Sequence, residues 1–102
     1  APGPDYQAWY RQATGALRQS LSYPQASLRD GEEGDVLVKV RLRRDGTILG
    51  TQLLQRSSYA ALNREALDVF GRVGRFQPVP ADYAPGNSEM DVSMPINFRM
   101  GE

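Results

Sequence analysis

The stretch Asp91-Val-Ser-Met-Pro-Ile-Asn-Phe-Arg-Met100 places an apolar residue at every second position without a break. Such alternation is typical of a β-strand that buries one face and exposes the other. The apolar set is Val92, Met94, Ile96, Phe98 and Met100, and the intervening set is Asp91, Ser93, Pro95, Asn97 and Arg99. We therefore expect the apolar set to point into a core and the intervening set to point into solvent.

Pro95 indicates where this strand lies in its sheet. Proline has no N–H to donate, and in sheets it is confined to edge strands, first positions or bulges. The N–H and C=O groups of alternate residues face the same neighbouring strand. The backbones of the intervening set should therefore face an open side, while Val92 to Phe98 of the apolar set bond the inner neighbour. An uncovered edge of this length favours aggregation unless a partner uses it.

A second alternating stretch lies earlier in the chain, at Val36–Arg43. One face would carry Val36, Val38, Val40 and Leu42, and the other Leu37, Lys39, Arg41 and Arg43. Asp45-Gly46 then predicts a hairpin turn and a return strand over about Ile48–Gln55. The return strand alternates less regularly, which indicates a bulge near Gly50 or a second face that is partly covered.

Helical spacing appears first near the start of the chain. Asp5 is a candidate N-cap, and Pro24 predicts the end of the helix. The apolar face between them is Tyr6, Trp9, Tyr10, Ala13, Ala16, Leu17 and Leu21. The polar stretch Ser27–Gly34 after it is expected to be a loop.

A second amphipathic helix is expected from about Leu62 to Val73. Ser57-Ser58 and Asn63 are its candidate caps, and Gly74 predicts its end. No His or Lys lies near the two serines to make a nucleophile of either, so a turn or cap is their expected role.

The order α-β-β-α-β predicts an α+β fold, a two-layer sandwich with both helices on one face of a three-stranded sheet. The first two strands form a hairpin, and a wholly antiparallel sheet then requires the order 2-1-3. The last strand lies at an edge. We expect one domain over residues 5–100, with residues 1–4 (Ala-Pro-Gly-Pro) as the end of a Pro-rich linker or a remnant of cloning.

Composition excludes several classes of function. The 102 residues contain no Cys and no His, which removes thiol nucleophiles, thiolate metal sites and the commonest general base. The formal net charge is zero, so no global field draws the chain to nucleic acid. We expect no catalytic residue, no metal and no cofactor. The chain is expected to be part of a longer one.

Two charged clusters have a functional and a structural interpretation. A cation site could be imagined at three acids, but they lie in a polar loop and solvation is the expected role; they are Glu32, Glu33 and Asp35. Several arginines could form a basic face, but alternate strand positions favour solvation of the outer sheet face; they are Arg41, Arg43, Arg44 and Arg56.

A series of short motifs occurs in a fixed order along the chain. They are Tyr23-Pro24, Glu33-Gly34-Asp35-Val36-Leu37-Val38, Asp45-Gly46, Ser57-Ser58, Leu62-Asn63, Phe76-Gln77-Pro78 and Pro95-Ile96-Asn97-Phe98. In this order and spacing, they resemble the TonB C-terminal domain family over Tyr6 to Met100. Ser58 departs from a usual Gly, and Asn63 departs from a usual acid.

The resemblance implies a non-enzymatic periplasmic domain at the end of an inner-membrane-anchored energy transducer, TonB or a close paralogue. Such proteins work with the proton-driven ExbB–ExbD motor and serve active uptake, including siderophore and iron uptake. The domain would capture the "TonB box" of an outer-membrane transporter as an added strand. The edge backbones from Asp91 to Arg99 would bind it. Ser22, Tyr23 and Pro24 either contact the same peptide or only end the helix and pack on the core.

Other functions remain open at this point. A TolA-like or other envelope-spanning adaptor would share the sheet and bind a different partner. A small hydrolase or ligand-binding domain is disfavoured because the sequence offers no convergent polar cluster. A homodimer through the edge strand is an alternative use of the edge.

Overall fold

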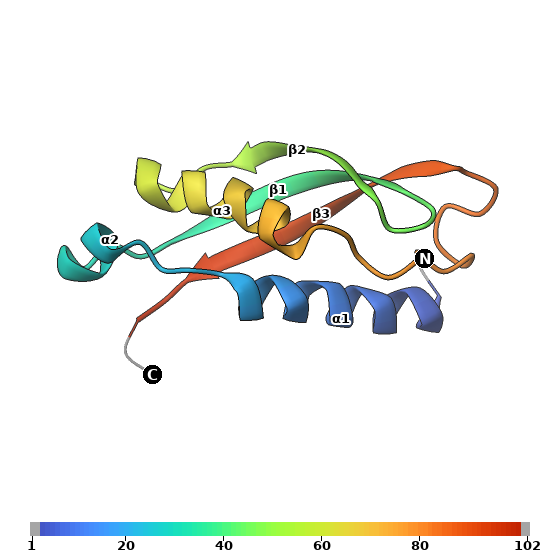
Figure 1. Cartoon of the computed structure of the whole chain (residues 1–102), viewed down its shortest axis with the longest axis horizontal. Helices are drawn as coiled ribbons and strands as arrows, with labels where there is room; N and C mark the ends of the chain where they lie inside the picture. Colours follow the sequence, from blue (N-terminus) through green and yellow to red (C-terminus); the bar gives the residue numbers. More distant parts are fainter. Residues whose placement is uncertain (1–2, 101–102) are drawn as a thin grey trace.

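The structure, a computed structural model, describes residues 3–100. The helices are α1 (Pro4–Ser20), α2 (Gln25–Arg29) and α3 (Ala60–Val73). The strands are β1 (Gly34–Arg43), β2 (Ile48–Gln55) and β3 (Glu89–Phe98). The molecule is elongated, with extents of 46 × 25 × 22 Å, and α1 runs along much of its length (Figure 1).

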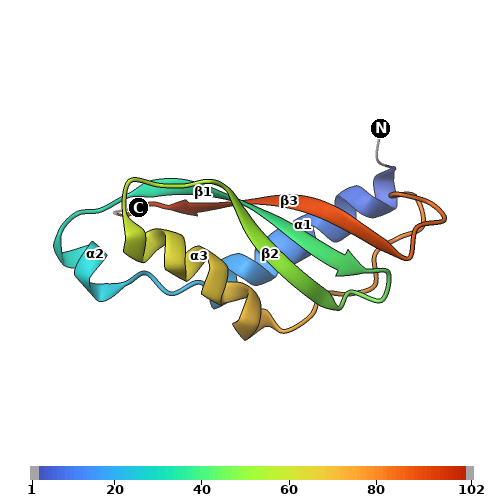
Figure 2. The same ribbon diagram turned by 90° about the horizontal axis from the view of Figure 1, so that it is seen from above.

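All three strands are antiparallel, in the order β2-β1-β3, which confirms the predicted sheet. β1 is central and β3 lies at one edge (Figure 2). The β1–β3 ladder runs without interruption from Gly34 opposite Phe98 to Arg43 opposite Glu89. β3 therefore ends at Phe98, because β1 begins at Gly34 and offers no partner to Arg99 or Met100.

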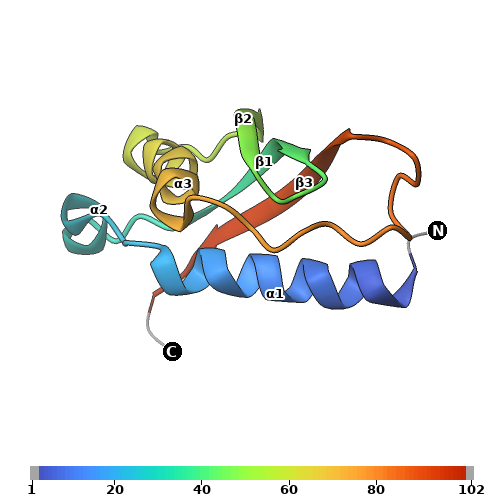
Figure 3. The same ribbon diagram turned by 45° about the vertical axis from the view of Figure 1, so that its right-hand side comes forward.

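α1 and α3 cover the same face of the sheet, as predicted for a two-layer α+β sandwich (Figures 1 and 3). The buried face of β1 and β3 is Val36, Val38, Val40, Leu42, Met90, Val92, Met94, Ile96 and Phe98. The helices contribute Tyr6, Trp9, Ala13, Leu17, Leu62, Ala66, Val69 and Phe70. The alternation predicted for both strands is confirmed, except that Met100 lies outside the strand and is half-buried.

The start of α1 differs from the prediction. Asp5 is not the N-cap: Gly3 is, and Pro4 is the first helical residue. Proline is favoured there because its missing N–H would have no intrahelical partner. The Asp5 N–H instead donates to the Asp82 carboxylate at 3.0 Å, from a distant loop. Residues 1 and 2 of the predicted linker lie outside the described residues.

Asn63 is also not a cap, because α3 begins three residues before it, at Ala60, with Tyr59 as N-cap. The Asn63 side chain bonds backward to the loop, accepting from the Ser57 N–H at 2.8 Å and donating to the Ser57 carbonyl at 3.2 Å. The Ser57 hydroxyl in turn accepts from the Tyr59 N–H at 3.1 Å. Ser57 thus closes the turn before the helix, the role expected of it. Gly74 ends α3 with φ 83°, as predicted.

β2 carries irregularities at both ends. Its register against β1 shifts between Arg41 and Leu42, beside Gly50, and again between Leu37 and Val38. The bulge predicted near Gly50 is therefore present. A short helix that was not predicted, α2, occupies part of the expected loop before Gly34. It follows Pro24, whose carbonyl accepts from the Leu28 N–H at 3.0 Å.

Arg44 does not solvate the outer sheet face as expected. Its guanidinium is half-buried and donates to carbonyls of the loop between α3 and β3, at distances from 2.6 to 3.4 Å. The acceptors are Val79, Pro80, Tyr83, Ala84 and Asn87. Arg41 does lie on the outer face, where it pairs with Glu89 and Asp91 of β3 at 3.2 Å.

Candidate functional site

The sheet has two edges, and they differ in regularity. β2 departs from its ladder at both ends, and bulges of this kind twist an edge and discourage pairing with another chain. β3 pairs with β1 over all of its 10 residues without a register shift. The outer side of β3 is therefore the better template for an added strand.

Two tyrosine hydroxyls show which way the β3 backbone points. Tyr83 donates to the Asp91 carbonyl at 2.7 Å, and Tyr10 donates to the Ser93 carbonyl at 2.8 Å. Both tyrosines lie outside the β1 ladder, in the loop before β3 and in α1. Alternate residues face the same side, so Pro95 and Asn97 follow Asp91 and Ser93 outward.

The outer edge of β3 is thus divided into two parts. The first part, Asp91–Ser93, has its outward carbonyls bonded to tyrosines. The second part, Pro95–Phe98, is named here the open edge. Within residues 3–100, no backbone hydrogen bond from outside the strand ladder reaches the open edge. The Arg99 guanidinium donates to the Phe98 carbonyl at 3.0 Å, at its end.

The side chains predicted at the edge have different surroundings. Those of Asp91, Ser93, Pro95 and Asn97 are exposed, as expected. Arg99 lies beyond the strand, and its guanidinium also pairs with Asp35 at 2.9 Å. The structure therefore places Arg99 at the end of the ladder rather than in it.

The second predicted segment lies beside the same end of β3. The Tyr23 ring packs edge-on against Phe98 with ring centroids 5.5 Å apart, and its hydroxyl donates to the Glu32 carbonyl. The Ser22 N–H donates to the nearly buried Glu65 carboxylate at 2.7 Å. Pro24 is the N-cap of α2. The structure thus brings the Ser22–Pro24 segment to one end of the open edge.

Sequence reasoning missed a small hollow between α1 and the open edge. It has a volume of about 150 Å³. Its lining residues are Tyr10, Thr14, Leu17, Arg18 and Leu21 of α1 and its C-cap, with Pro95, Ile96 and Asn97 of β3. The available signal was a helical stripe on α1 that continues past the core positions, from Tyr10 to Leu21.

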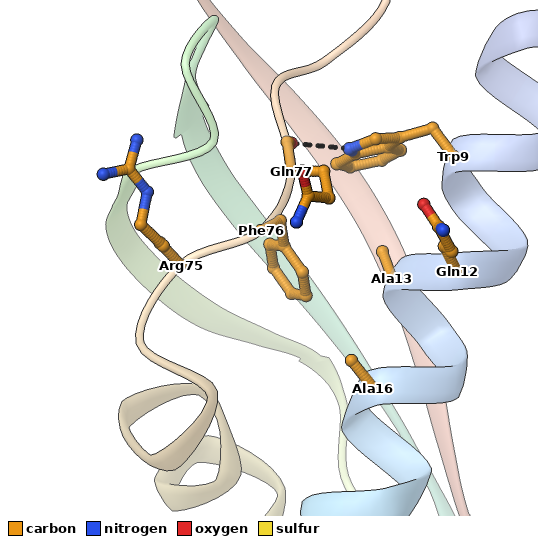
Figure 4. A pocket seen from close by; sticks show the side chains of 7 residues that line it. All are labelled: Trp9, Gln12, Ala13, Ala16, Arg75, Phe76 and Gln77. Carbon is orange, nitrogen blue, oxygen red and sulfur yellow. Dashed lines mark hydrogen bonds between the residues drawn. The ribbon is translucent and has the colours of Figure 1, made fainter.

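A separate hollow of about 210 Å³ lies on the other side of α1 (Figure 4). Its lining residues are Trp9, Gln12, Ala13, Ala16, Arg75, Phe76 and Gln77, none of them from β3. The Trp9 indole N–H donates to the Gln77 carbonyl at 2.7 Å and holds the segment between α3 and β3 against α1. This contact is structural.

The loop acids do not converge on one point. Glu32 accepts from the Ser27 hydroxyl at 2.8 Å, and Glu33 accepts from the Met100 N–H at 2.8 Å. Asp35 pairs with Arg99. Among residues 3–100, no group of three acids is placed to hold a metal ion. The same residues include no helix long and apolar enough to cross a membrane.

Comparison with known proteins identifies the class of this fold. The family model described as the Gram-negative bacterial TonB protein C-terminal matches residues 19–100. This chain belongs to that family. No curated protein sequence matches it.

Solved structures of the same class share the fold. The solution structure of the Helicobacter pylori TonB C-terminal domain has a TM-score of 0.72 at 20% identity, covering 100% of this chain and 99% of that one. The C-terminal domain of HasB has a TM-score of 0.61 at 29% identity, covering 95% of this chain and 72% of that one. The Pseudomonas aeruginosa TonB C-terminal domain has a TM-score of 0.56 at 21% identity, covering 79% of each chain.

Proposed function

We propose that this domain binds an extended segment of an outer-membrane transporter, its TonB box, as a fourth strand along the open edge of β3. The observation that carries this proposal is the asymmetry of the two sheet edges. β2 is bulged at both ends, whereas β3 is regular and has outward backbone groups at Pro95 and Asn97 without a partner among residues 3–100. Backbone hydrogen bonds then supply affinity, and side chains supply selectivity.

Membership of the TonB C-terminal family supports a larger role for the chain. The domain acts in the periplasm as the terminal part of an inner-membrane-anchored energy transducer. An ExbB–ExbD motor supplies force through the anchor, and the docked strand passes that force to the transporter for active uptake. The domain itself binds a protein and does no chemistry, in keeping with a sequence that contains neither His nor Cys.

The Ser22–Pro24 segment has a secondary role in this proposal. Glu65 and Arg72 fix the first residue of this segment, because the Glu65 carboxylate accepts hydrogen bonds from both the Ser22 N–H and the Arg72 guanidinium. Tyr23 is half-buried against Phe98. A docked strand that continues past Phe98 meets this segment, which limits how far the strand extends.

An NMR titration with synthetic peptides from transporter N-terminal segments tests the proposal. The amide resonances of Asn97 and Arg99 are expected to shift on binding, while those of Thr51 and Gln52 on the opposite edge stay in place. Peptides from partners of TolA-type adaptors serve as the comparison set. Shifts confined to β2, or binding only of the comparison set, would contradict the proposal. The affinity is expected to be the same with and without EDTA.

A further inference from the structure

Two arms of tyrosine side chains join the first two turns of α1 to β3. In the first arm, the Tyr10 hydroxyl donates directly to the Ser93 carbonyl at 2.8 Å. In the second arm, the Tyr6 ring stacks on the Tyr83 ring, with centroids 4.0 Å apart and an angle of 13° between the planes. The Tyr83 hydroxyl then donates to the Asp91 carbonyl at 2.7 Å. Tyr6, Tyr10 and Tyr83 are named here the tyrosine clamp.

Further contacts hold the second arm in place. The Asp82 carboxylate, next to Tyr83, accepts from the Asp5 N–H in the first turn of α1 at 3.0 Å. The Arg44 guanidinium donates to the Tyr83 carbonyl at 2.9 Å and so fixes the loop that presents this ring. Tyr6 is only 7% exposed. The clamp therefore connects a helix end to a fixed loop, which makes it a stiff connection.

The second half of α1 is attached to a different element. Within residues 3–100, no hydrogen bond joins residues 14–20 of this helix to β3. The hollow of about 150 Å³ lies between this half of α1 and the open edge. At the end of α1, the Arg72 guanidinium of α3 donates to the Ser20 carbonyl at 3.2 Å. α1 thus has two attachments, the tyrosine clamp to β3 and the Arg72 bond to α3.

The position of the clamp determines what a pull on the domain would stretch. In the proposed function, force arrives through the chain that precedes α1 and is opposed by a strand docked on the open edge. α1 and β3 both start at the same end of the molecule and run along its length (Figures 1 and 2). Such a pull slides α1 along β3 toward that end. It stretches both arms together, because they begin on one stretch of helix and end two residues apart on one strand.

We propose that the tyrosine clamp is the connection through which force passes from α1 to β3, without crossing β1, β2 or α3. Asp91 and Ser93 receive the force, and the same strand backbone continues two residues later into the open edge at Pro95. This inference rests on the proposed function, which supplies both the pull and the docked strand. A clamp that only stabilised the fold would resist pulling in every direction, whereas this one resists a pull on α1 in particular.

Force spectroscopy in two directions of pulling tests the clamp. The chain contains no Cys, so paired substitutions supply the only thiols to which handles can be attached. Ala1→Cys with Asn97→Cys pulls α1 against the open edge. Gln52→Cys with Asn97→Cys pulls the two edges of the sheet apart from exposed positions. Optical tweezers hold each pair at constant force and record the lifetime of the folded domain.

Tyr10→Phe combined with Tyr83→Phe is expected to shorten the lifetime roughly tenfold when α1 is pulled, as the loss of two hydrogen bonds predicts. When the sheet edges are pulled, the same variant should last as long as wild type, because the interrupted β1–β2 ladder opens first. Tyr23→Phe is the matched control. It removes a tyrosine hydroxyl that donates to the Glu32 carbonyl at the other end of β3, and it should change neither lifetime. Arg72→Met should shorten the lifetime under a pull on α1 less than the tyrosine pair does.

The outcomes separate the clamp from the proposed function. If the tyrosine pair shortens both lifetimes by the same factor, or shortens neither, the clamp is refuted. If Arg72→Met has the larger effect when α1 is pulled, force leaves α1 through α3 and the clamp is also refuted. Peptide binding enters neither measurement. A domain with the expected lifetimes that binds no transporter peptide at the open edge would keep the clamp and contradict the proposed function.

Discussion

The Tyr10 hydroxyl donates a hydrogen bond of 2.8 Å to the backbone carbonyl of Ser93. Tyr83 makes the equivalent bond to Asp91, at 2.7 Å. Burial raises the pKa of Tyr10, so its hydroxyl stays protonated and continues to donate at neutral pH. The two tyrosines occupy outward acceptors of an edge strand and leave only the open edge for a partner. Edge strands are a source of unwanted pairing, and this arrangement shortens the exposed template.

We predict that Tyr10→Phe combined with Tyr83→Phe exposes the first part of the β3 edge. Each lost hydrogen bond contributes only about 1 kcal/mol, so the domain stays folded. Pairing between copies should increase, because a longer run of outward backbone groups is free. Sedimentation velocity over a range of concentrations measures this self-association. Tyr59→Phe, at an exposed position, is the control. Unchanged self-association would show that the hydroxyls do not restrict the edge.

Arg44 is predicted to be the main support of the loop between α3 and β3. Its guanidinium donates to five carbonyl groups of that loop. Arg44→Met keeps the apolar stem and removes every donor, which leaves half-buried acceptors without partners. We expect a loss of roughly 3 kcal/mol in the free energy of unfolding. Arg43→Met, at an exposed neighbouring position, should change it little. Chemical denaturation of both variants measures the difference, and equal stabilities would contradict the assigned role.

The strands could be predicted from sequence because the information is local. In β3, the polarity of each side chain indicates whether it faces the core or solvent, and Pro95 indicates that the strand lies at an edge of the sheet. The start of α1 could not be predicted correctly, because the partner of the Asp5 N–H, the Asp82 carboxylate, is distant in sequence. The loop role of Arg44 is equally non-local. The residues around Arg44 in the sequence give no indication that its guanidinium bonds to carbonyl groups near residue 80.

The candidate site follows the same division. The edge position of β3 could be predicted from that strand alone, but its shortening to the open edge could not, because the Tyr10 and Tyr83 hydroxyls that occupy Ser93 and Asp91 come from other elements. The hollow exists only where α1 lies against β3, and the residues that line it are separated by most of the chain. The helical stripe from Tyr10 to Leu21 was visible in the sequence. Its last members looked like core, because nothing local distinguishes a residue that faces a core from one that faces the rim of a groove.

The hairpin turn is predicted to weaken in acid. Hydrogen bonds from the side chain and backbone of Thr47, with smaller contributions from Arg75 and Arg43, lower the pKa of Asp45. A lowered pKa in the folded state gives stability that is present above the unfolded pKa and lost as pH falls through the folded one. Wild type should therefore be more stable than Asp45→Asn at pH 7, and the difference should shrink as the pH falls below the ordinary Asp pKa of about 3.9. Thermal unfolding of both proteins across this range measures it; a constant difference would contradict the linkage.

Affinity for an isolated peptide is predicted to be weak. One added strand makes few anchoring contacts and must be immobilised on binding, so we expect a Kd on the order of micromolar or weaker. The intact transporter should bind more tightly because it presents further surface. Calorimetric titration with the peptide and with the detergent-solubilised transporter measures both. A nanomolar Kd for the peptide alone would mean that contacts beyond the added strand supply much of its binding energy.

Proline substitution distinguishes the two sides of β3, because it deletes one N–H at a chosen position. Asn97 is exposed and its backbone is predicted to face outward. Asn97→Pro should leave the domain folded with at most a modest loss of stability and should weaken peptide binding substantially. Asn97→Ala keeps the N–H and removes the side chain, so it should bind like wild type.

Ile96 lies opposite Val36 in the ladder and is 4% exposed. Ile96→Pro should remove a ladder hydrogen bond and a buried side chain together, at a cost of about 3 kcal/mol or more. Thermal unfolding of both proline variants, with peptide titration of the folded ones, decides which backbone N–H groups of β3 face outward. If Asn97→Pro unfolds the domain while Ile96→Pro does not, the backbone of β3 faces the opposite way. If Asn97→Pro folds and binds like wild type, the peptide docks elsewhere, because the outward N–H of the open edge is then not used.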